Sequence, residues 1–228
     1  MKSVKAFFGA NQSGKTTSGC YELCCHLTGY YPDWWKGRKW ARPVKWRLFA
    51  SDFTNGVRVV TDKIHEWMPS KAVIELFRNN QKADVDWYIQ HVSGGVSNLQ
   101  VMSYEQEDKL AEGWIGDGVL YDEPPRRSIY IATSRGLIAR RGLSLFTLTP
   151  LREPWLFDEI YNSTNQNIFS IISDMRHNLE RINPLTKQVI GLSEEAIREF
   201  EKILTEEERE TRAHGKFRYL AGRIWKEW

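Results

Sequence analysis

The stretch GANQSGKTT, residues 9–17, decides the fold. It follows VKAFF (4–8), a short apolar run typical of a buried strand, and it opens into residues 15–27, where apolar residues recur at helical spacing. The stretch matches G-x-x-x-x-G-K-[ST], the phosphate-binding loop or Walker A motif, in the strand–loop–helix context that this loop requires. The start of the chain is therefore predicted to hold the phosphates of a nucleotide.

Each part of this loop has a physical reason to hold phosphate. Backbone N–H groups at the start of the helix point into one concavity, and the glycines permit the backbone angles and the close approach that this needs. The lysine reaches the β- and γ-phosphates, and the hydroxyl of Thr16 is a ligand for Mg²⁺. The predicted nucleotide-binding residues are Gly9, Asn11, Gln12, Ser13, Gly14, Lys15, Thr16 and Thr17.

The composition is that of an ordinary globular protein. The chain has 228 residues, 41% hydrophobic and 27% charged, which is long enough for a sizeable core. Its 32 basic and 29 acidic residues leave a net charge of +3, too balanced to indicate a nucleic-acid-binding protein by itself. No apolar run approaches the ~20 residues of a membrane span, so we expect no membrane association.

The three cysteines, Cys20, Cys24 and Cys25, lie on the helix predicted after the loop. Only His26 lies nearby as a further metal ligand, so buried apolar side chains are a better interpretation than a metal site. Few cysteines and no signal peptide favour a reducing, intracellular compartment.

The rest of the chain alternates between strand-like and helix-like segments, which predicts an α/β fold with a mainly parallel sheet flanked by helices. Strands are predicted at 44–51, 87–104 (a hairpin around Gly94-Gly95), 117–125, 143–149 and 167–173, and helices at 54–67, 70–78, 127–139 and 154–162.

From residue 176 the sequence becomes charged and helical, with Ser193 as a helix N-cap and Thr205 and Glu208 as a capping box. We therefore predict a core at 1–175 and a small helical subdomain at 176–228.

A second candidate site follows the apolar strand VLYDE (119–123), which ends in two carboxylates beside the phosphate loop. Asp122 is placed to steer Mg²⁺ through its water shell, and Glu123 to orient and deprotonate an attacking water. This pair suits hydrolysis rather than phosphoryl transfer to a metabolite. A later strand ends in TLTP, where Thr147 and Thr149 are candidates to sense the γ-phosphate; an ordinary capped strand end explains these two residues equally well.

Taken as an ordered set, these stretches resemble the ATPase region of the large terminase subunit of tailed double-stranded DNA bacteriophages. The resemblance covers nearly the whole chain, and the ordered set is more specific than the phosphate loop alone. It is carried by GANQSGKT (9–16), GYYPDWWKGRKW (29–40), SYEQ (103–106), LYDEPP (120–125), TLTPLREPWLFDE (147–159) and ERETRAHGKF (208–217).

The resemblance implies a P-loop NTPase of the ASCE, RecA-like type with a helical lid subdomain. Such a protein is a motor that hydrolyses ATP with Mg²⁺ and drives double-stranded DNA into an empty procapsid. The implied partners are the portal protein and the small terminase subunit, and the implied location is the cytoplasm of the bacterial host. A homo-oligomeric ring, a pentamer on the procapsid, is also implied, and a monomer stays open for an isolated domain.

Carried over to this sequence, the resemblance makes Lys15 and Thr16 phosphate and Mg²⁺ ligands, Asp122 the metal-steering acid and Glu123 the catalytic base. The segment Thr147–Thr149 becomes the element that couples hydrolysis to movement. Such subunits usually carry a C-terminal nuclease domain as well. This chain stops at Trp228, where that domain would start, so we expect no nuclease activity from it.

A ring motor can take an arginine for the γ-phosphate from the neighbouring subunit. Arg126 and Arg127 follow the acidic pair, but we favour Arg135, Arg140 or Arg141, because that stretch leads towards the predicted coupling strand.

Two other functions remain open. A helicase-like P-loop motor would share the ATP site, and a nucleotide-dependent switch would bind without mechanical output, although Glu123 beside Asp122 argues against the switch. No Asn-Lys-x-Asp guanine signature occurs, which argues against a GTPase. The basic cluster Lys36, Arg38 and Lys39 is a candidate DNA contact, with a solvated loop face as the simpler alternative.

Overall fold

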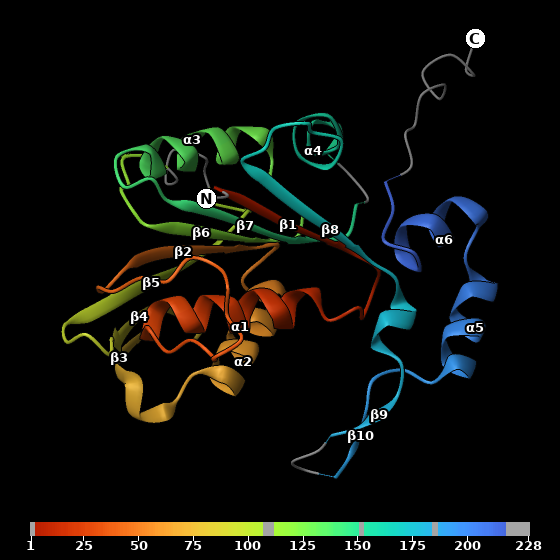
Figure 1. Cartoon of the computed structure of the whole chain (residues 1–228), viewed down its shortest axis with the longest axis horizontal. Coiled ribbons are helices and arrows are strands. Elements are labelled where there is room, and N and C mark those ends of the chain that lie inside the picture. Colours follow the sequence, from red (N-terminus) through yellow and green to blue (C-terminus); the bar gives the residue numbers. More distant parts are fainter. Residues whose placement is uncertain (1–2, 107–111, 151–152, 184–186, 218–228) are drawn as a thin grey trace.

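One large sheet with helices on both faces makes up most of the structure (Figure 1). The computed structural model describes residues 3–106, 112–150, 153–183 and 187–217. The strands are β1 (Val4–Gly9), β2 (Lys45–Ala50), β3 (Val73–Arg78), β4 (Asp84–Gln90), β5 (Val96–Ser103), β6 (Gly118–Asp122), β7 (Leu143–Leu148), β8 (Ile168–Ser173), β9 (Arg181–Ile182) and β10 (Val189–Ile190). The helices are α1 (Lys15–Thr28), α2 (Gly56–Trp67), α3 (Arg127–Ile138), α4 (Pro154–Leu156), α5 (Glu194–Ile203) and α6 (Glu206–Arg212), with the short helical turns η1 (Ser70–Ala72), η3 (Phe157–Tyr161) and η4 (Met175–Asn178).

The sheet is mainly parallel, as predicted. Its strands lie in the order β3-β4-β5-β2-β6-β7-β1-β8, and those from β5 to β8 in this order run parallel. Strands β6 and β7 are buried along their whole length because helices cover both faces, which explains their continuous apolar sequences. The carboxyl ends of β1, β6 and β7 therefore meet at one edge of the sheet, and this edge carries the candidate site.

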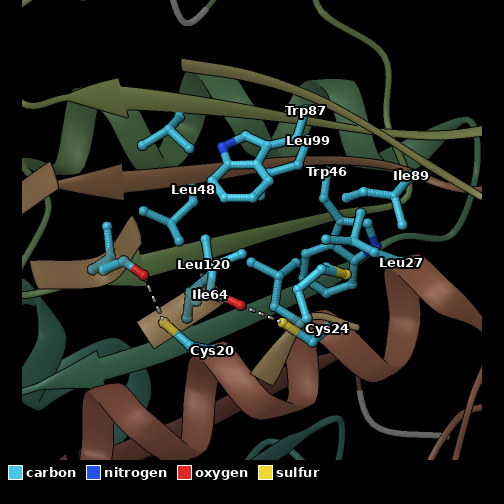
Figure 2. Close-up of a cluster of buried hydrophobic side chains, with 14 of the residues drawn as sticks. Cys20, Cys24, Leu27, Trp46, Leu48, Ile64, Trp87, Ile89, Leu99 and Leu120 are labelled. Carbon is cyan, nitrogen blue, oxygen red and sulfur yellow. Dashed lines mark hydrogen bonds between the residues drawn. The ribbon is translucent and has the colours of Figure 1, made fainter. Parts of the chain in front are cut away.

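Helices α1 and α2 cover one face of the sheet, and α3 and α4 cover the other (Figure 1). Figure 2 shows part of the core on the first face, where Cys20 and Cys24 lie among Trp46, Trp87 and Leu120. The two thiols donate to backbone carbonyl oxygens of α2. All three cysteines are free and buried, as the sequence predicts. Among the described residues, no group of three His, Cys, Asp or Glu side chains could hold a metal ion.

The helix predicted at 70–78 is wrong. Only the single turn η1 is helical, and residues 73–78 form the edge strand β3, which pairs antiparallel with β4. Side chains of a regular strand alternate between the two faces of the sheet, but the pairing of β3 with β4 shifts by one position between Val73 and Glu75. As a result, the side chains of Val73 and Leu76 both pack against the core. This spacing of three imitates a helix in the sequence, and pairing with β4 decides the structure instead.

Other predicted elements agree more closely. The hairpin around Gly94-Gly95 is confirmed as β4 and β5. The helix predicted at 154–162 is a short turn, α4, that continues as the π-helix η3. The two-stranded sheet of β9 and β10 was not predicted, because its strands have only two residues each.

The tail beyond residue 175 lies at the carboxyl edge of the sheet, where α5 and α6 sit beside the end of β1 (Figure 1). Both predicted caps are confirmed: Ser193 caps α5, and Thr205 forms a capping box with Glu208 at the start of α6. The last part of the predicted subdomain, 218–228, lies outside the described residues. Among the described residues, no helix is long and apolar enough to span a bilayer.

Candidate active site

The phosphate loop joins β1 to α1 and has the backbone geometry that its sequence predicts. Gly14 lies in the left-handed region with φ of 88°. A Cβ atom on Gly9 would lie 2.4 Å from the hydroxyl oxygen of Ser13, so any larger residue there would force the Ser13 side chain to move. The first backbone bond of the helix runs from the Ser18 N–H to the Gly14 carbonyl, which leaves the N–H groups of residues 15–17 without a helical acceptor. This end of α1 is thus an anion-binding terminus.

The lysine of the loop points towards the second predicted site. Lys15 Nζ lies 3.6 Å from Glu123 Oε1, and the Lys15 side chain is only 10% exposed. A buried ammonium group needs a negative partner. The hydroxyl of Ser13 is also buried, and it has no hydrogen-bond partner among the described residues. The Ser13 hydroxyl is therefore available to an oxygen atom of a bound phosphate chain, and the Lys15 ammonium group lies beside Glu123 at the same edge of the sheet.

Three oxygen-bearing side chains meet at the end of β6. The hydroxyls of Thr16 and Thr147 each donate to Asp122 Oδ1, and both donor–acceptor distances are 2.8 Å. The structure thereby joins the phosphate loop, β6 and β7 through one carboxylate oxygen. Burial and the adjacent charge of Glu123 raise the pKa of Asp122 to about 6. A cation held beside Asp122 would stabilise its charged form.

Hydroxyl and carboxylate oxygens are the ligands that Mg²⁺ prefers. Thr16 and Asp122 supply one of each within hydrogen-bonding distance, beside the helix terminus where phosphate would lie. The donor set therefore fits a magnesium ion that is bound jointly by these residues, phosphate oxygens and water.

Glu123 follows β6 in an unusual conformation. Its φ is 69°, in the left-handed region that residues with a side chain seldom adopt. Its N–H donates to the Thr147 carbonyl at 3.0 Å, and its Oε2 accepts from the Thr149 N–H at 3.2 Å. The carboxylate is thus held against the end of β7, and its side chain remains 39% exposed, so water can reach it. Strained backbones of this kind are concentrated at functional sites.

Residues of the tail also contact the phosphate loop. The tail as a whole was predicted to be a lid subdomain, but the sequence singled out none of these contact residues. The Asn11 N–H donates to the Arg212 carbonyl at 2.8 Å, and Asn178 Nδ2 donates to the Gln12 carbonyl at 2.8 Å. Gly215 lies directly against the backbone of Ala10. The segment ERETRAHGKF carries part of the family resemblance, but the sequence does not show that it contacts the phosphate loop. The two segments are about two hundred residues apart in the sequence, and only the folded structure brings them together.

The favoured arginines lie at the other edge of the sheet. Arg135 is exposed in the last turn of α3, and Arg140 and Arg141 precede β7, whose opposite end carries Thr147. Six residues of strand span about 20 Å. Arg140 pairs with the buried Asp117 at 3.2 Å. These arginines are therefore remote from the Glu123 of their own chain.

The two other arginines lie beside the site. Arg126 Nη2 donates to the Tyr104 carbonyl at 2.8 Å, and Arg127 pairs with Glu159 at 2.7 Å. The basic cluster Lys36, Arg38 and Lys39 lies on the loop after α1, and Arg38 donates to the Arg141 carbonyl at 2.6 Å. This cluster is therefore not part of the phosphate site.

Comparisons with known proteins agree with the predicted fold. Among solved structures, the chain is similar to a large terminase from a thermophilic bacteriophage in complex with ADP, with a TM-score of 0.68 and 14% sequence identity. The match covers 95% of this chain and 48% of that chain, so this chain spans about half the length of that structure. A search of curated proteins found no match.

A family model described as terminase large subunit, T4likevirus-type, N-terminal matches residues 6–227. The structural likeness, at 14% identity, supports the P-loop NTPase fold, whereas the family match spans nearly the whole chain. The chain therefore belongs to the family of terminase large subunits of the T4likevirus type and corresponds to their N-terminal region.

Proposed function

We propose that this chain is the ATPase motor of phage DNA packaging, which hydrolyses ATP to move double-stranded DNA into a procapsid. The observation that carries the proposal is the convergence of four side chains at the carboxyl edge of one sheet. Lys15 Nζ lies 3.6 Å from Glu123 Oε1, and Thr16 Oγ1 lies 2.8 Å from Asp122 Oδ1. Membership of the terminase large subunit family supports the same function.

In the proposed reaction, the N-terminus of α1 and Lys15 hold the phosphate chain and stabilise the charge that develops on the transferring group. Thr16 and Asp122 would hold Mg²⁺, and a bound Mg²⁺ would neutralise part of the negative charge of the phosphate chain. Glu123 orients a water molecule and accepts its proton as the water attacks the γ-phosphorus. The exposure of the Glu123 side chain on the loop side of β6 supports this role.

The end of β7 is proposed to couple hydrolysis to movement. Thr147 bonds to Asp122, and the Thr149 N–H bonds to Glu123, so this strand end contacts both acidic side chains. A change at the γ-phosphate that moves either carboxylate would also displace Thr147 or Thr149. The tail, with α5 and α6, is proposed to act as a lid, because Arg212 and Asn178 bond to the phosphate loop.

The proposed partners are double-stranded DNA, the portal protein, the small terminase subunit and further copies of this chain in a ring. Arg135, Arg140 and Arg141 lie at the edge of the sheet opposite Glu123. A finger arginine from this group would therefore act on a neighbouring chain, since its own site is out of reach.

Complementation tests this arrangement. A chain with Glu123→Gln supplies arginines but no base, and a chain with one of the three arginines changed to Ala supplies a base but no finger. If the finger acts in trans, a mixture of the two inactive chains regains ATP turnover. Mixtures that stay inactive for all three arginines would contradict the proposed finger.

Phosphate release from ATP tests the proposed function itself. Lys15→Met keeps most of the buried stem and removes the charge, so turnover is expected to fall by a factor of about 10² or more. Lys63→Met is the matched control, because Lys63 is a half-buried lysine of α2 that is paired with Glu66, outside the phosphate loop. Stimulation by duplex but not single-stranded DNA would support packaging over a helicase. No turnover by the wild-type chain under either condition would contradict the proposal.

A further inference from the structure

The backbone of Glu123 is held in a conformation that it would not adopt alone. A left-handed backbone is unfavourable for a residue with a Cβ atom, and it persists only where the surroundings fix it. Glu123 has a φ of 69°. The backbone conformation of Glu123 sets the direction of its Cα–Cβ bond and therefore the direction in which its carboxylate points.

In the described part of the chain, three hydrogen bonds restrain Glu123, and two of them come from the end of β7. Its N–H and its Oε2 bond to the backbone of Thr147 and Thr149, which are at the end of β7. The third restraint comes from the other side. The hydroxyl of Tyr104 donates to the Glu123 carbonyl at 2.9 Å. Tyr104 follows β5, which is separated from β6 by β2 in the sheet, so its side chain reaches across a whole strand.

Tyr104 is itself fixed at several points. Its N–H donates to the Ala50 carbonyl at 2.9 Å, and its carbonyl accepts from Arg126 at 2.8 Å. Its ring stacks on Phe49 of β2 with centroids 5.8 Å apart and planes 10° apart. Burial raises the pKa of Tyr104, so the phenol keeps its proton and acts as the donor. The hydroxyl is thus presented to Glu123 from a rigid support.

We infer that Tyr104 is a positioning residue for hydrolysis: its hydroxyl holds the left-handed backbone of Glu123 and so aims the carboxylate at the attacking water. The inference rests on the proposed function, in which Glu123 is the base. Among the described residues, Tyr104 makes no hydrogen bond to Lys15, Thr16 or Asp122. It acts through the Glu123 carbonyl, on the side of the residue that β7 does not reach.

The expected effect is on the chemical step. Without the hydroxyl, the Glu123 carbonyl loses its donor and the strained backbone loses one of its restraints. A displacement of about 1 Å in a reacting group can cost on the order of 10²-fold in rate, so a partial loss of aim should cost roughly tenfold. Nucleotide binding should be unchanged, because within the part of the chain that the structure describes Tyr104 makes no hydrogen bond to the residues proposed to hold phosphate.

Tyr104→Phe makes the test, because it removes only the hydroxyl and keeps the ring on Phe49. Tyr121→Phe is a matched control. Tyr121 also stacks on Phe49, with centroids 6.0 Å apart, but its hydroxyl bonds to Thr133 on α3 instead of to Glu123. We expect kcat to fall roughly tenfold in Tyr104→Phe only, with the Kd for nucleotide unchanged in both variants.

The combination with Glu123→Gln separates positioning from a general structural role. If Tyr104 acts through Glu123, then Tyr104→Phe has no further effect on the residual rate of Glu123→Gln. Wild-type kcat in Tyr104→Phe, an equal loss in Tyr121→Phe, or a further loss in the double variant would overturn the inference. If Glu123→Gln itself turned over at the wild-type rate, the proposed function would fail, and the inference would fail with it.

Discussion

Thr147 Oγ1 lies 2.8 Å from Asp122 Oδ1, so the end of β7 is hydrogen-bonded to the carboxylate at the end of β6. The oxygen that accepts this bond also accepts from Thr16, at the start of α1. One carboxylate oxygen of Asp122 therefore connects Thr16 of the phosphate loop to Thr147 of β7. A change in the position of this carboxylate would thus be transmitted directly to the end of β7.

Replacing Thr147 by Val should lower ATP turnover. Valine keeps the buried volume and removes the hydroxyl, so Asp122 loses one of its two donors. A hydrogen bond to a charged group contributes about 1.5–3 kcal/mol, which corresponds to a decrease of roughly 10- to 10²-fold in kcat. Phosphate release at saturating Mg²⁺ measures the effect.

Thr61→Val is the control for this substitution. Thr61 is also a buried threonine, but its hydroxyl bonds to the Arg58 carbonyl within α2, away from the site. An equal decrease in both variants would mean that the hydroxyl of Thr147 has only a structural role.

Gly215→Ala should weaken nucleotide binding. Gly215 has a φ of 67°, and a Cβ atom there would lie 2.5 Å from the Ser173 carbonyl oxygen and 2.7 Å from the Ala10 N. These two atoms bond to each other at 2.9 Å, so the methyl group would disrupt the first hydrogen bond of the phosphate loop. We expect a loss of about 1–3 kcal/mol of stability beyond the backbone strain, with a raised Kd for nucleotide.

Gly94→Ala is the control that separates the backbone strain of a positive φ from the steric clash expected in Gly215→Ala. Gly94 has a φ of 86° in the turn between β4 and β5, and a Cβ atom there meets no atom within 4 Å. Thermal unfolding and nucleotide titration of the two variants give the comparison. Equal unfolding temperatures and equal affinities would contradict the proposed contact between the tail and the phosphate loop.

The tail should loosen in acid. Arg176 makes two hydrogen bonds to the Glu201 carboxylate, at 2.6 and 2.9 Å, and these bonds lower the pKa of Glu201. Since the pKa is lower in the folded state, the pair contributes stability above the unfolded pKa of Glu, and this contribution is lost as the pH falls through the folded value. Glu201→Gln should therefore cost roughly 1 kcal/mol near pH 7, and the difference from wild type should shrink below about pH 4.5.

Thermal unfolding against pH makes this measurement. Glu199→Gln is the control, because Glu199 forms an exposed pair with Lys202, and its side chain is 64% exposed. A difference between wild type and Glu201→Gln that stays constant across this pH range would rule out the ion pair as its cause.

Much of the arrangement of the candidate site could be predicted because its residues lie in contiguous motifs at strand ends. Lys15 and Thr16 follow β1, and Asp122 and Glu123 end or follow β6, so a parallel sheet brings them to one edge. The nucleotide-binding fold follows from the same pattern. The helix predicted at 70–78 was wrong over residues 73–78. A register shift in the edge strand β3 turns Val73 and Leu76 to the same face, and their spacing of three residues is also that of a helix.

The contacts that support the site could not be predicted, since they join residues that are far apart in the sequence. SYEQ was conspicuous, but nothing in its composition indicates that Tyr104 bonds to the backbone of Glu123 across β2.

Glu123→Gln tests the central claim most directly. The amide keeps the size of the side chain but does not accept a proton, and a general base contributes about 10²–10⁴-fold to the rate. Binding of Mg-ATP, by titration, and ATP turnover, by phosphate release, should be measured on the same preparation. We predict a Kd close to that of wild type with turnover lower by that factor. Wild-type turnover, or an equal loss of binding and turnover, would contradict the assignment of Glu123 as the base of an ATP-hydrolysing site.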